Sequence, residues 1–161
     1  MSDKKFDIGL VSLEDITIRN ATLENHSGKT SVDLSGLEIA FQYELNPSIS
    51  IRSKKVQITA EYDIRVAEAN SEKLEISSRY SIVFLYAVEN LVELAIPDER
   101  KGLSVDDEML SNLLNITYST SRGILYTRYL GTLLQGLILP IIATTELFES
   151  PSAVKSILTK S

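Results

Sequence analysis

Cysteine is missing from this 161-residue chain, and histidine occurs only once, as His26. The absence of cysteine excludes disulfides, thiolate catalysis and cysteine-bound zinc, and it favours a reducing cytoplasm as the compartment. The histidine lies in a polar segment without a nearby serine or carboxylate cluster of recognisable spacing. We therefore interpret His26 as a surface residue rather than a catalytic base.

The sequence also lacks a long apolar run and a concentrated basic region. The longest apolar run, residues 133–143, contains Gln135, Gly136 and Pro140 and falls short of the ~20 residues that a bilayer span needs. The amino-terminal stretch MSDKKFDIG has no apolar signal region. The formal net charge of -6 has the wrong sign for phosphate binding. We expect neither membrane insertion nor a nucleic-acid partner.

Residue patterns that carry catalysis are absent as well. Acidic residues occur as sequence neighbours, such as Glu14 with Asp15 and the trio at residues 106–108. Neighbours on a strand point to opposite faces, and acids at a helix start interact with the helix dipole, so neither set predicts a catalytic pair or a metal cage. The glycines form no GxGxxG or phosphate-binding loop. From the sequence we therefore expect that the chain binds no metal ion and no cofactor, and that it is not an enzyme.

What the chain does contain is a series of segments that alternate between apolar and polar residues. Residues 6–20 alternate with a change of phase at Glu14 and Asp15, which indicates a bulged strand. The other alternating segments are residues 37–45, 48–68 and 74–84. A turn at residues 69–72 joins the last two. Because these strands precede the helical segments, we predict an α+β fold, with helices on one side of an antiparallel sheet.

A long helix is predicted after the strands. Ser104, followed three residues later by Asp107, resembles a capping box, so we expect the helix to begin near Val105 and to continue to about Leu134. Residues spaced three and four apart mark one side of it: Leu110, Leu113, Leu114, Thr117, Ser121, Ile124, Leu125 and Arg128.

A second stripe of this helix consists of small residues, namely Thr120, Gly123, Thr127 and Gly131. A glycine inside a helix costs about 1 kcal/mol relative to alanine, so two of them indicate that another backbone approaches closely. The partner is either the chain's own sheet or a second subunit, and the stripe by itself leaves both open.

The remaining segments are a charged linker at residues 97–102 and a carboxyl-terminal tail. In the tail, Ser150 before Pro151 resembles a helix start, and Ala153, Val154, Ile157 and Leu158 follow at helical spacing, so we predict a short terminal helix. By length, residues 1–161 form one domain, with the sheet over about 6–90 and the helices over about 105–160.

More apolar residues are present than a short helix over a four-stranded sheet requires. They are Leu37, Ile39, Phe41 and Tyr43 in the second strand, the loop residues Leu137, Leu139 and Ile141, and Leu147 with Phe148 in the tail. These residues either belong to the core or line an open groove. Such a groove would bind extended polypeptide by hydrophobicity rather than by sequence.

These segments, in this order, resemble the SecB family of protein-export chaperones. FDIGLVSLEDITIRNA resembles the first strand of that family, and VQITAEYDIRV with LEISSRYSIVFLY resembles its central hairpin. The long helix is similar in its YSTSR step, its glycine-containing end and the LPI loop that follows. The match extends over roughly residues 6–148 of the chain.

The resemblance implies a four-stranded antiparallel Greek-key sheet with a long helix and a short carboxyl-terminal helix. It further implies a cytoplasmic homotetramer, built as a dimer of dimers through the long helices, with the small-residue stripe as the seam. It also implies an ATP-independent holdase whose groove binds non-native polypeptides before export. The groove positions of the family correspond to the apolar surplus from Leu37 to Phe148.

The family docks the SecA translocase motor through acids on the exposed sheet face. Asp15 and Glu75 stand in that region here, whereas Arg19 and Ser77 replace two expected acidic positions. The resemblance therefore supports the holding of clients more strongly than the delivery of clients to SecA. The alternatives are a SecB-like chaperone dedicated to one client, such as an antitoxin, and a structural homo-oligomer whose groove is closed by its own tail.

Overall fold

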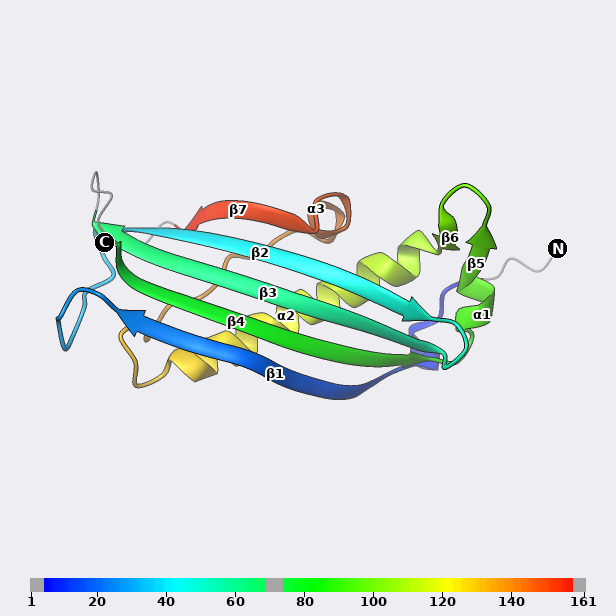
Figure 1. Cartoon of the computed structure of the whole chain (residues 1–161), viewed down its shortest axis with the longest axis horizontal. Coiled ribbons are helices and arrows are strands. Elements are labelled where there is room, and N and C mark those ends of the chain that lie inside the picture. The colour runs from blue at the N-terminus through cyan, green and yellow to red at the C-terminus, as the bar shows by residue number, and fades with distance from the viewer. Residues whose placement is uncertain (1–4, 69–73, 158–161) are drawn as a thin grey trace.

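The alternating segments pair into one antiparallel sheet with the strand order β1-β4-β3-β2-β7 (Figure 1). The computed structural model describes residues 5–68 and 74–157, so the turn predicted at 69–72 lies outside the described residues. The strands are β1 (Val11–Asn25), β2 (Leu37–Ser50), β3 (Lys55–Glu68), β4 (Leu74–Val88) and β7 (Ser152–Ile157). Strands β2, β3 and β4 are successive neighbours and β1 lies beside β4, which is the predicted Greek-key order.

The predicted alternation is confirmed on the central strands. In β3, Val56, Ile58, Ala60, Tyr62, Ile64 and Val66 are buried, and the residues between them are exposed or half-buried. The phase change in β1 is also confirmed, because its pairing with β4 shifts register between Leu13 and Asp15, and again between Ile18 and Asn20. One face of the sheet is therefore apolar and the other is polar.

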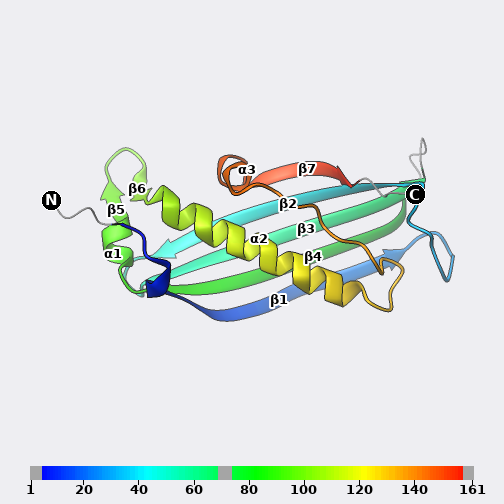
Figure 2. The same cartoon turned by 180° about the vertical axis from the view of Figure 1, so that it is seen from behind.

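The long helix α2 (Asp107–Tyr129) crosses the apolar face of the sheet diagonally (Figure 2). The predicted cap at Ser104 is wrong, because Ser104 lies in a strand and Asp106 caps the helix by accepting a hydrogen bond from the Met109 N–H at 2.8 Å. The residues that α2 buries against the sheet are Met109, Leu113, Leu114, Thr117, Tyr118, Ser121, Leu125 and Tyr129.

The helix ends five residues before the predicted end at Leu134, since its last residue is Tyr129. Gly131 lies beyond the helix with a φ of 76°, a left-handed conformation that glycine adopts without strain. Gly131 is therefore a turn residue, and the predicted fourth member of the small-residue stripe is wrong. The connection from residue 130 to 143 returns across the apolar face to α3 (Thr144–Glu149) (Figure 2).

Four short elements were not predicted from the sequence. The segment expected to be a charged linker is a hairpin of β5 (Ala95–Asp98) and β6 (Gly102–Val105), preceded by α1 (Leu91–Leu94). A short turn of 3-10 helix, η1 (Ile8–Leu10), precedes β1.

The tail after α3 is a strand, so the helix predicted from Pro151 onward is wrong. Strand β7 pairs antiparallel with residues 39–44 of β2, and the Leu45 N–H donates to the Pro151 carbonyl at 2.8 Å. A helix of this length is marginal on its own, because nucleation costs more than one or two turns return. The free main-chain groups at the edge of β2 offer the tail a complete set of partners instead.

Candidate functional site

The structure brings the predicted groove residues together at the edge of β2. Ile39, Phe41 and Tyr43 point from β2 to the apolar face, where they belong to the same core cluster as Leu139 and Leu147. Leu137 and Ile142 from the same connection also join this cluster. Segments about 100 positions apart in the sequence thus form one apolar layer at this edge.

Most of these residues are sealed in the chain as it stands. Phe41, Tyr43 and Leu147 are 0% exposed, and Ile39, Leu137 and Leu139 are at most 4% exposed. Leu37 and Phe148 are half-buried, and only Ile141, at 83%, is fully open to solvent. The open groove implied by the family resemblance is therefore closed at this edge, and its residues act as core, which is the other alternative that the sequence left open.

The floor of the closed site is an aromatic cluster. Phe41 stacks on Tyr43 with ring centroids 5.6 Å apart and on Tyr62 at 6.5 Å, and Tyr118 of α2 lies 5.8 Å from Tyr43. Burial raises the pKa of Tyr62 and of Tyr118 above the ordinary range of tyrosine. These hydroxyls therefore stay protonated near neutral pH and do not act as bases. The Tyr118 hydroxyl donates a hydrogen bond, whereas the buried Tyr62 hydroxyl has no partner among the described residues.

The segment that closes the site is held mainly through its main chain. The Tyr118 hydroxyl donates to the Pro140 carbonyl at 2.6 Å, and Arg122 Nε donates to the Leu139 carbonyl at 2.9 Å. Farther along, the Tyr43 hydroxyl donates to the Ser150 carbonyl at 3.0 Å. Side chains of α2 and β2 thus fix the path of this segment through its main-chain carbonyl groups, so these hydrogen bonds do not depend on the side chains of the segment.

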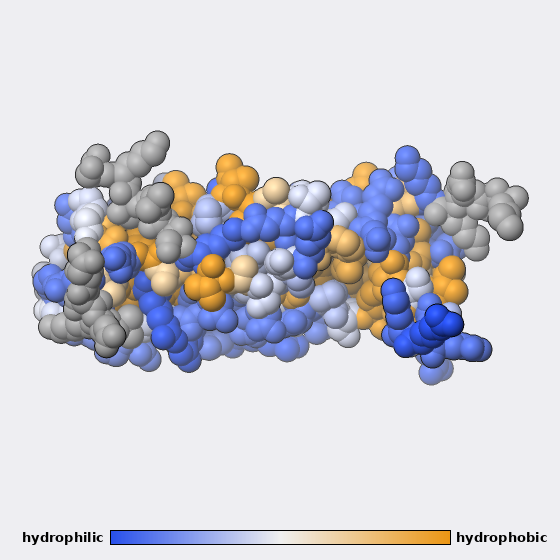
Figure 3. Space-filling view, turned by 90° about the horizontal axis from the view of Figure 1, so that it is seen from above, coloured by the Kyte–Doolittle hydropathy of each residue, from blue (hydrophilic) through white to orange (hydrophobic). Residues whose placement is uncertain are grey.

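We call residues 144–157, which comprise α3 and β7, the strap. Its one side-chain ion pair joins Lys155 of β7 to Glu146 of α3, within the strap itself, and this bond raises the pKa of Lys155. Val154 is 69% exposed on the polar face of the sheet. Seen from the strap edge, the surface is largely hydrophilic along β7, and apolar residues gather toward the ends of the molecule (Figure 3).

A second candidate surface is a groove between α2 and β1. It has a volume of about 680 Å³ and is lined by Ile16 and Ile18 of β1 and by Ser119, Thr120, Gly123, Ile124, Thr127 and Arg128 of α2. Three of the four predicted stripe residues therefore line one apolar groove, and Gly131 does not. A side chain added at Gly123 would meet no atom within 4 Å, so the chain's own sheet does not need this glycine.

The predicted SecA-docking pair does not lie on one surface. Asp15 is exposed and accepts a hydrogen bond from the Thr17 hydroxyl at 2.8 Å. Glu75 is 2% exposed, and its Oε2 lies 3.7 Å from Nζ of Lys29. The prediction for Glu75 is wrong because Glu75 is the extra residue of a bulge in β4: Val66 of β3 pairs with Ile76 and Ala67 pairs with Leu74, so the alternation is disturbed at Glu75.

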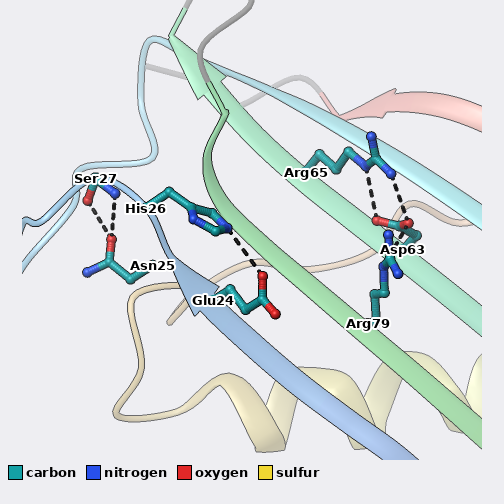
Figure 4. Close-up of polar contacts among 7 residues, drawn as sticks. All are labelled: Glu24, Asn25, His26, Ser27, Asp63, Arg65 and Arg79. Atoms are coloured by element: carbon teal, nitrogen blue, oxygen red, sulfur yellow. Dashed lines mark hydrogen bonds and ion pairs between the residues drawn. The ribbon is translucent and has the colours of Figure 1, made fainter.

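The polar face instead carries mixed charges (Figure 4). Asp63 lies 3.4 Å from Nε of Arg65 and 3.3 Å from Nε of Arg79, and His26 lies 3.3 Å from Glu24. His26 is exposed, which agrees with its interpretation as a surface residue. Positive and negative groups balance each other locally, so this region is not a concentrated acidic surface.

Two further features, a metal site and a membrane-spanning helix, can be assessed for residues 5–68 and 74–157. No group of three or more histidine or acidic residues is arranged to hold a metal ion in this range. None of the helices described there is long and apolar enough to cross a membrane.

Comparison with known proteins identifies the fold. No family model matches the chain, and no curated protein matches it. Among solved structures, the chain is similar to the Mycobacterium tuberculosis SecB-like chaperone Rv1957 in complex with a ChAD peptide from the HigA1 antitoxin Rv1956. The TM-score is 0.57 at 12% sequence identity, and the match covers 83% of this chain and 92% of that chain. The chain therefore has the SecB-like fold.

One feature of the site and one feature outside it were missed from the sequence. The first is β7, for which the available signal was the alternation of Ser152, Val154 and Ser156 with Ala153 and Lys155. The second is an exposed apolar pair near the amino-terminal end of α2, Val92 and Ile96, at 52% and 54% exposure. Both lie in short stretches, where helical and strand patterns are hard to separate.

Proposed function

We propose that the chain is an ATP-independent chaperone that holds non-native polypeptide, without catalysing a reaction. The observation that carries the proposal is the apolar layer along β2, covered at its edge by the chain's own tail, in a SecB-like fold. The solved neighbour is a SecB-like chaperone with a peptide bound. A holdase needs surface that is apolar, accessible on demand and indifferent to client sequence.

The first test is suppression of aggregation. Chemically denatured citrate synthase is diluted into buffer with and without a stoichiometric amount of the chain, in the absence of nucleotide, and light scattering is recorded. We expect scattering to fall. The variant Ile141→Asp should suppress less, because Ile141 is the one fully exposed member of the predicted groove.

The matched control is Val92→Asp, an equally drastic change at an exposed apolar residue of α1, outside the predicted groove. We expect this variant to behave as the unchanged chain does. If the chain fails to lower scattering at any stoichiometry, the proposal of a general holdase is wrong.

A chaperone dedicated to one client is the second candidate. The neighbour was solved with a peptide from an antitoxin, which favours this narrower function. A dedicated chaperone would bind a defined extended peptide far more tightly than a generic unfolded chain. Titration with both classes of ligand separates the two functions.

Assembly is proposed to use the groove between α2 and β1. Thr120, Gly123 and Thr127 present little side-chain bulk, and Ile16 and Ile18 add apolar surface beside them. Two copies of this groove can pack closely, in a dimer of dimers like that of the SecB family. We propose that this association occurs in the cytoplasm, in keeping with the cysteine-free sequence.

Delivery of clients for export is the finer proposal with the least support. Of the two predicted contacts with SecA, only Asp15 is exposed. Export therefore requires that SecA recognise the polar sheet face without a contact from Glu75. A pull-down of purified SecA with the unchanged chain and with Asp15→Lys tests this contact directly.

A further inference from the structure

The strap occupies the edge of β2 in the manner of a bound strand. From Ile39 paired with Ile157 to Glu44 paired with Ser152, β7 follows β2 in antiparallel register. Strand addition of this kind depends on main-chain hydrogen bonds, which any extended polypeptide can supply. The edge of β2 is therefore a generic binding surface that the chain fills with its own tail.

The side chains of β7 suit this edge poorly. On the apolar side, Ala153 pairs with Tyr43 and Lys155 pairs with Phe41, so a small residue and a charged one stand over the aromatic layer. On the opposite side, Val154 is exposed beside Gln42. A strand with large apolar residues at the positions of Ala153 and Lys155 would bury more apolar area of its own at this edge.

We propose that β7 is a replaceable strand, and that an extended apolar segment of a client pairs with residues 39–44 of β2 in its place. The inference rests on the proposed function and adds its mechanism of recognition. The strap then regulates client binding, because a client binds only those molecules in which β7 has left the edge. Release of the strap also breaks the hydrogen bond from the Tyr43 hydroxyl to the Ser150 carbonyl and removes Leu147 from the core cluster.

Population arithmetic gives the size of the effect. If the strap is docked in about nine-tenths of the molecules, the apparent affinity for a client is about tenfold weaker than that of the open form. Fixing the strap should abolish binding at the edge, and loosening it should strengthen binding by up to about tenfold. Both the loss of client binding and its strengthening can be measured as changes in apparent affinity.

The cysteine-free sequence allows a clean lock. Gln42 and Val154 are register partners, both exposed on the polar face, so Gln42→Cys with Val154→Cys introduces the only two thiols of the chain. Paired residues of antiparallel strands have Cα atoms about 4.5–5.5 Å apart, which suits a disulfide. Thiol titration verifies closure, and failure of the cysteines to oxidise would contradict the pairing itself.

The matched control locks strands that do not separate on client binding. Asn46 of β2 and Thr59 of β3 are also register partners on the polar face, so Asn46→Cys with Thr59→Cys gives a disulfide that leaves β7 free. The probe is reduced and carboxymethylated α-lactalbumin, a soluble chain that stays unfolded. Its binding is measured by fluorescence anisotropy, for both locks in the oxidised and reduced states.

We expect the oxidised strap lock to bind the probe at least about tenfold more weakly than the control lock, with recovery on reduction. Equal binding by the two oxidised locks would overturn the inference and leave the proposed function standing. Absence of binding by the unchanged chain and by both reduced variants would overturn the proposed function, and the inference with it.

Hydrogen exchange on the unchanged chain gives a second measurement. On addition of the probe, amides of residues 152–157 should exchange faster because they leave the edge. Amides of residues 39–44 should stay protected because the client pairs with them. Unaltered exchange at 152–157 under saturating probe would mean that clients bind elsewhere.

Discussion

The two outer strands of the set β1 to β4, namely β2 and β1, differ in how their outward main chain is covered. Strand β2 pairs with β3 without a register shift over its whole length, and its apolar side is sealed by the strap. Strand β1 has two register shifts and is exposed or half-buried along its whole length, Val11–Asn25. An unpaired edge invites association, and bulges and charged residues discourage it.

The difference indicates separate tasks for the two edges. The β2 edge is regular, apolar beneath and covered by a detachable segment, which suits the transient binding of an extended chain. The β1 edge is irregular and carries Glu14, Asp15 and Arg19, but it borders the groove of small residues on α2. That groove suits a permanent contact between folded copies. The predictions below test this division.

The largest expected difference is in stability. Phe41→Ala should lower the free energy of unfolding by about 3–5 kcal/mol, because it leaves a cavity beneath the strap. Leu13→Ala, at a residue of β1 that is 42% exposed and lies outside the groove between α2 and β1, should cost less than about 1 kcal/mol. Urea unfolding followed by circular dichroism measures both. Similar costs would show that the two edges are equally buried in solution, for example by assembly over β1.

Assembly should depend on the β1 side. Gly123→Ala and Gly123→Leu both remove the helix cost of glycine, about 1 kcal/mol, but only leucine fills the groove. We expect Gly123→Leu to dissociate the assembly and Gly123→Ala to keep it, as measured by light scattering coupled to size exclusion. An unchanged mass for Gly123→Leu would place the interface elsewhere.

Two tyrosine hydroxyls compare the anchoring of the strap with that of α2. Tyr129 shares a buried hydrogen bond of 2.8 Å with Ser78, so Tyr129→Phe should cost about 1–2 kcal/mol of global stability. Tyr43→Phe removes the 3.0 Å bond to the Ser150 carbonyl. We expect it to speed hydrogen exchange of residues 152–157 more than it lowers the unfolding midpoint. The reverse ranking would mean that the strap unfolds only with the whole domain.

The smallest effects on hydrogen exchange and client binding are expected from substitutions that break the two lysine ion pairs. Lys155 pairs with Glu146 within the strap, and Lys55 pairs with Glu14 beside β1. Exposed ion pairs contribute little to stability because solvent screens them. Lys155→Gln should speed exchange in the strap and strengthen client binding slightly, whereas Lys55→Gln should change neither. Equal responses to the two substitutions would argue against a local role of Lys155.

The pair within the strap also predicts a pH dependence. The hydrogen bond to Glu146 raises the pKa of Lys155 above its value in the free strap, so protonated lysine favours docking. The contribution is complete below about pH 10.5 and is lost as the pH rises through the raised pKa. Exchange in the strap, corrected for the intrinsic rate, should therefore increase above that pH in the unchanged chain. In Lys155→Gln the increase should be smaller, because there only the Tyr43 hydroxyl, which anchors the strap and has a raised pKa, still titrates in this range. Identical profiles for the two chains would show that the ion pair does not contribute to docking.

Much of the fold could be predicted because its signals are local. Alternation placed the strands from β1 to β4, and even the bulge near Asp15 was visible as a change of phase. Spacing of three and four placed α2 and most of its buried side. Such patterns reflect which face of an element meets the core, and that face is repeated many times along a long element.

The site was predicted less well because its state depends on distant contacts. The sequence identified the apolar residues of the β2 edge but left open whether they form core or groove. Closure depends on Tyr118 and Arg122 of α2 binding the connection at Pro140 and Leu139, and on β2 recruiting the tail. A six-residue tail has too few repeats to reveal its conformation, so the sheet edge decides it.

By itself, the sequence determined the alternation of the strands, the long amphipathic helix and a surplus of apolar side chains, because each is encoded within a continuous segment. Only the tertiary structure decided that Phe41 and Tyr43 are covered, that Glu75 is buried, that Gly131 is a turn residue and that the tail is a strand. Each of these depends on a neighbour remote in sequence or on where an element ends. Main-chain hydrogen bonding at a free strand edge does not depend on side chains, so no local sequence pattern predicts that the tail pairs with β2.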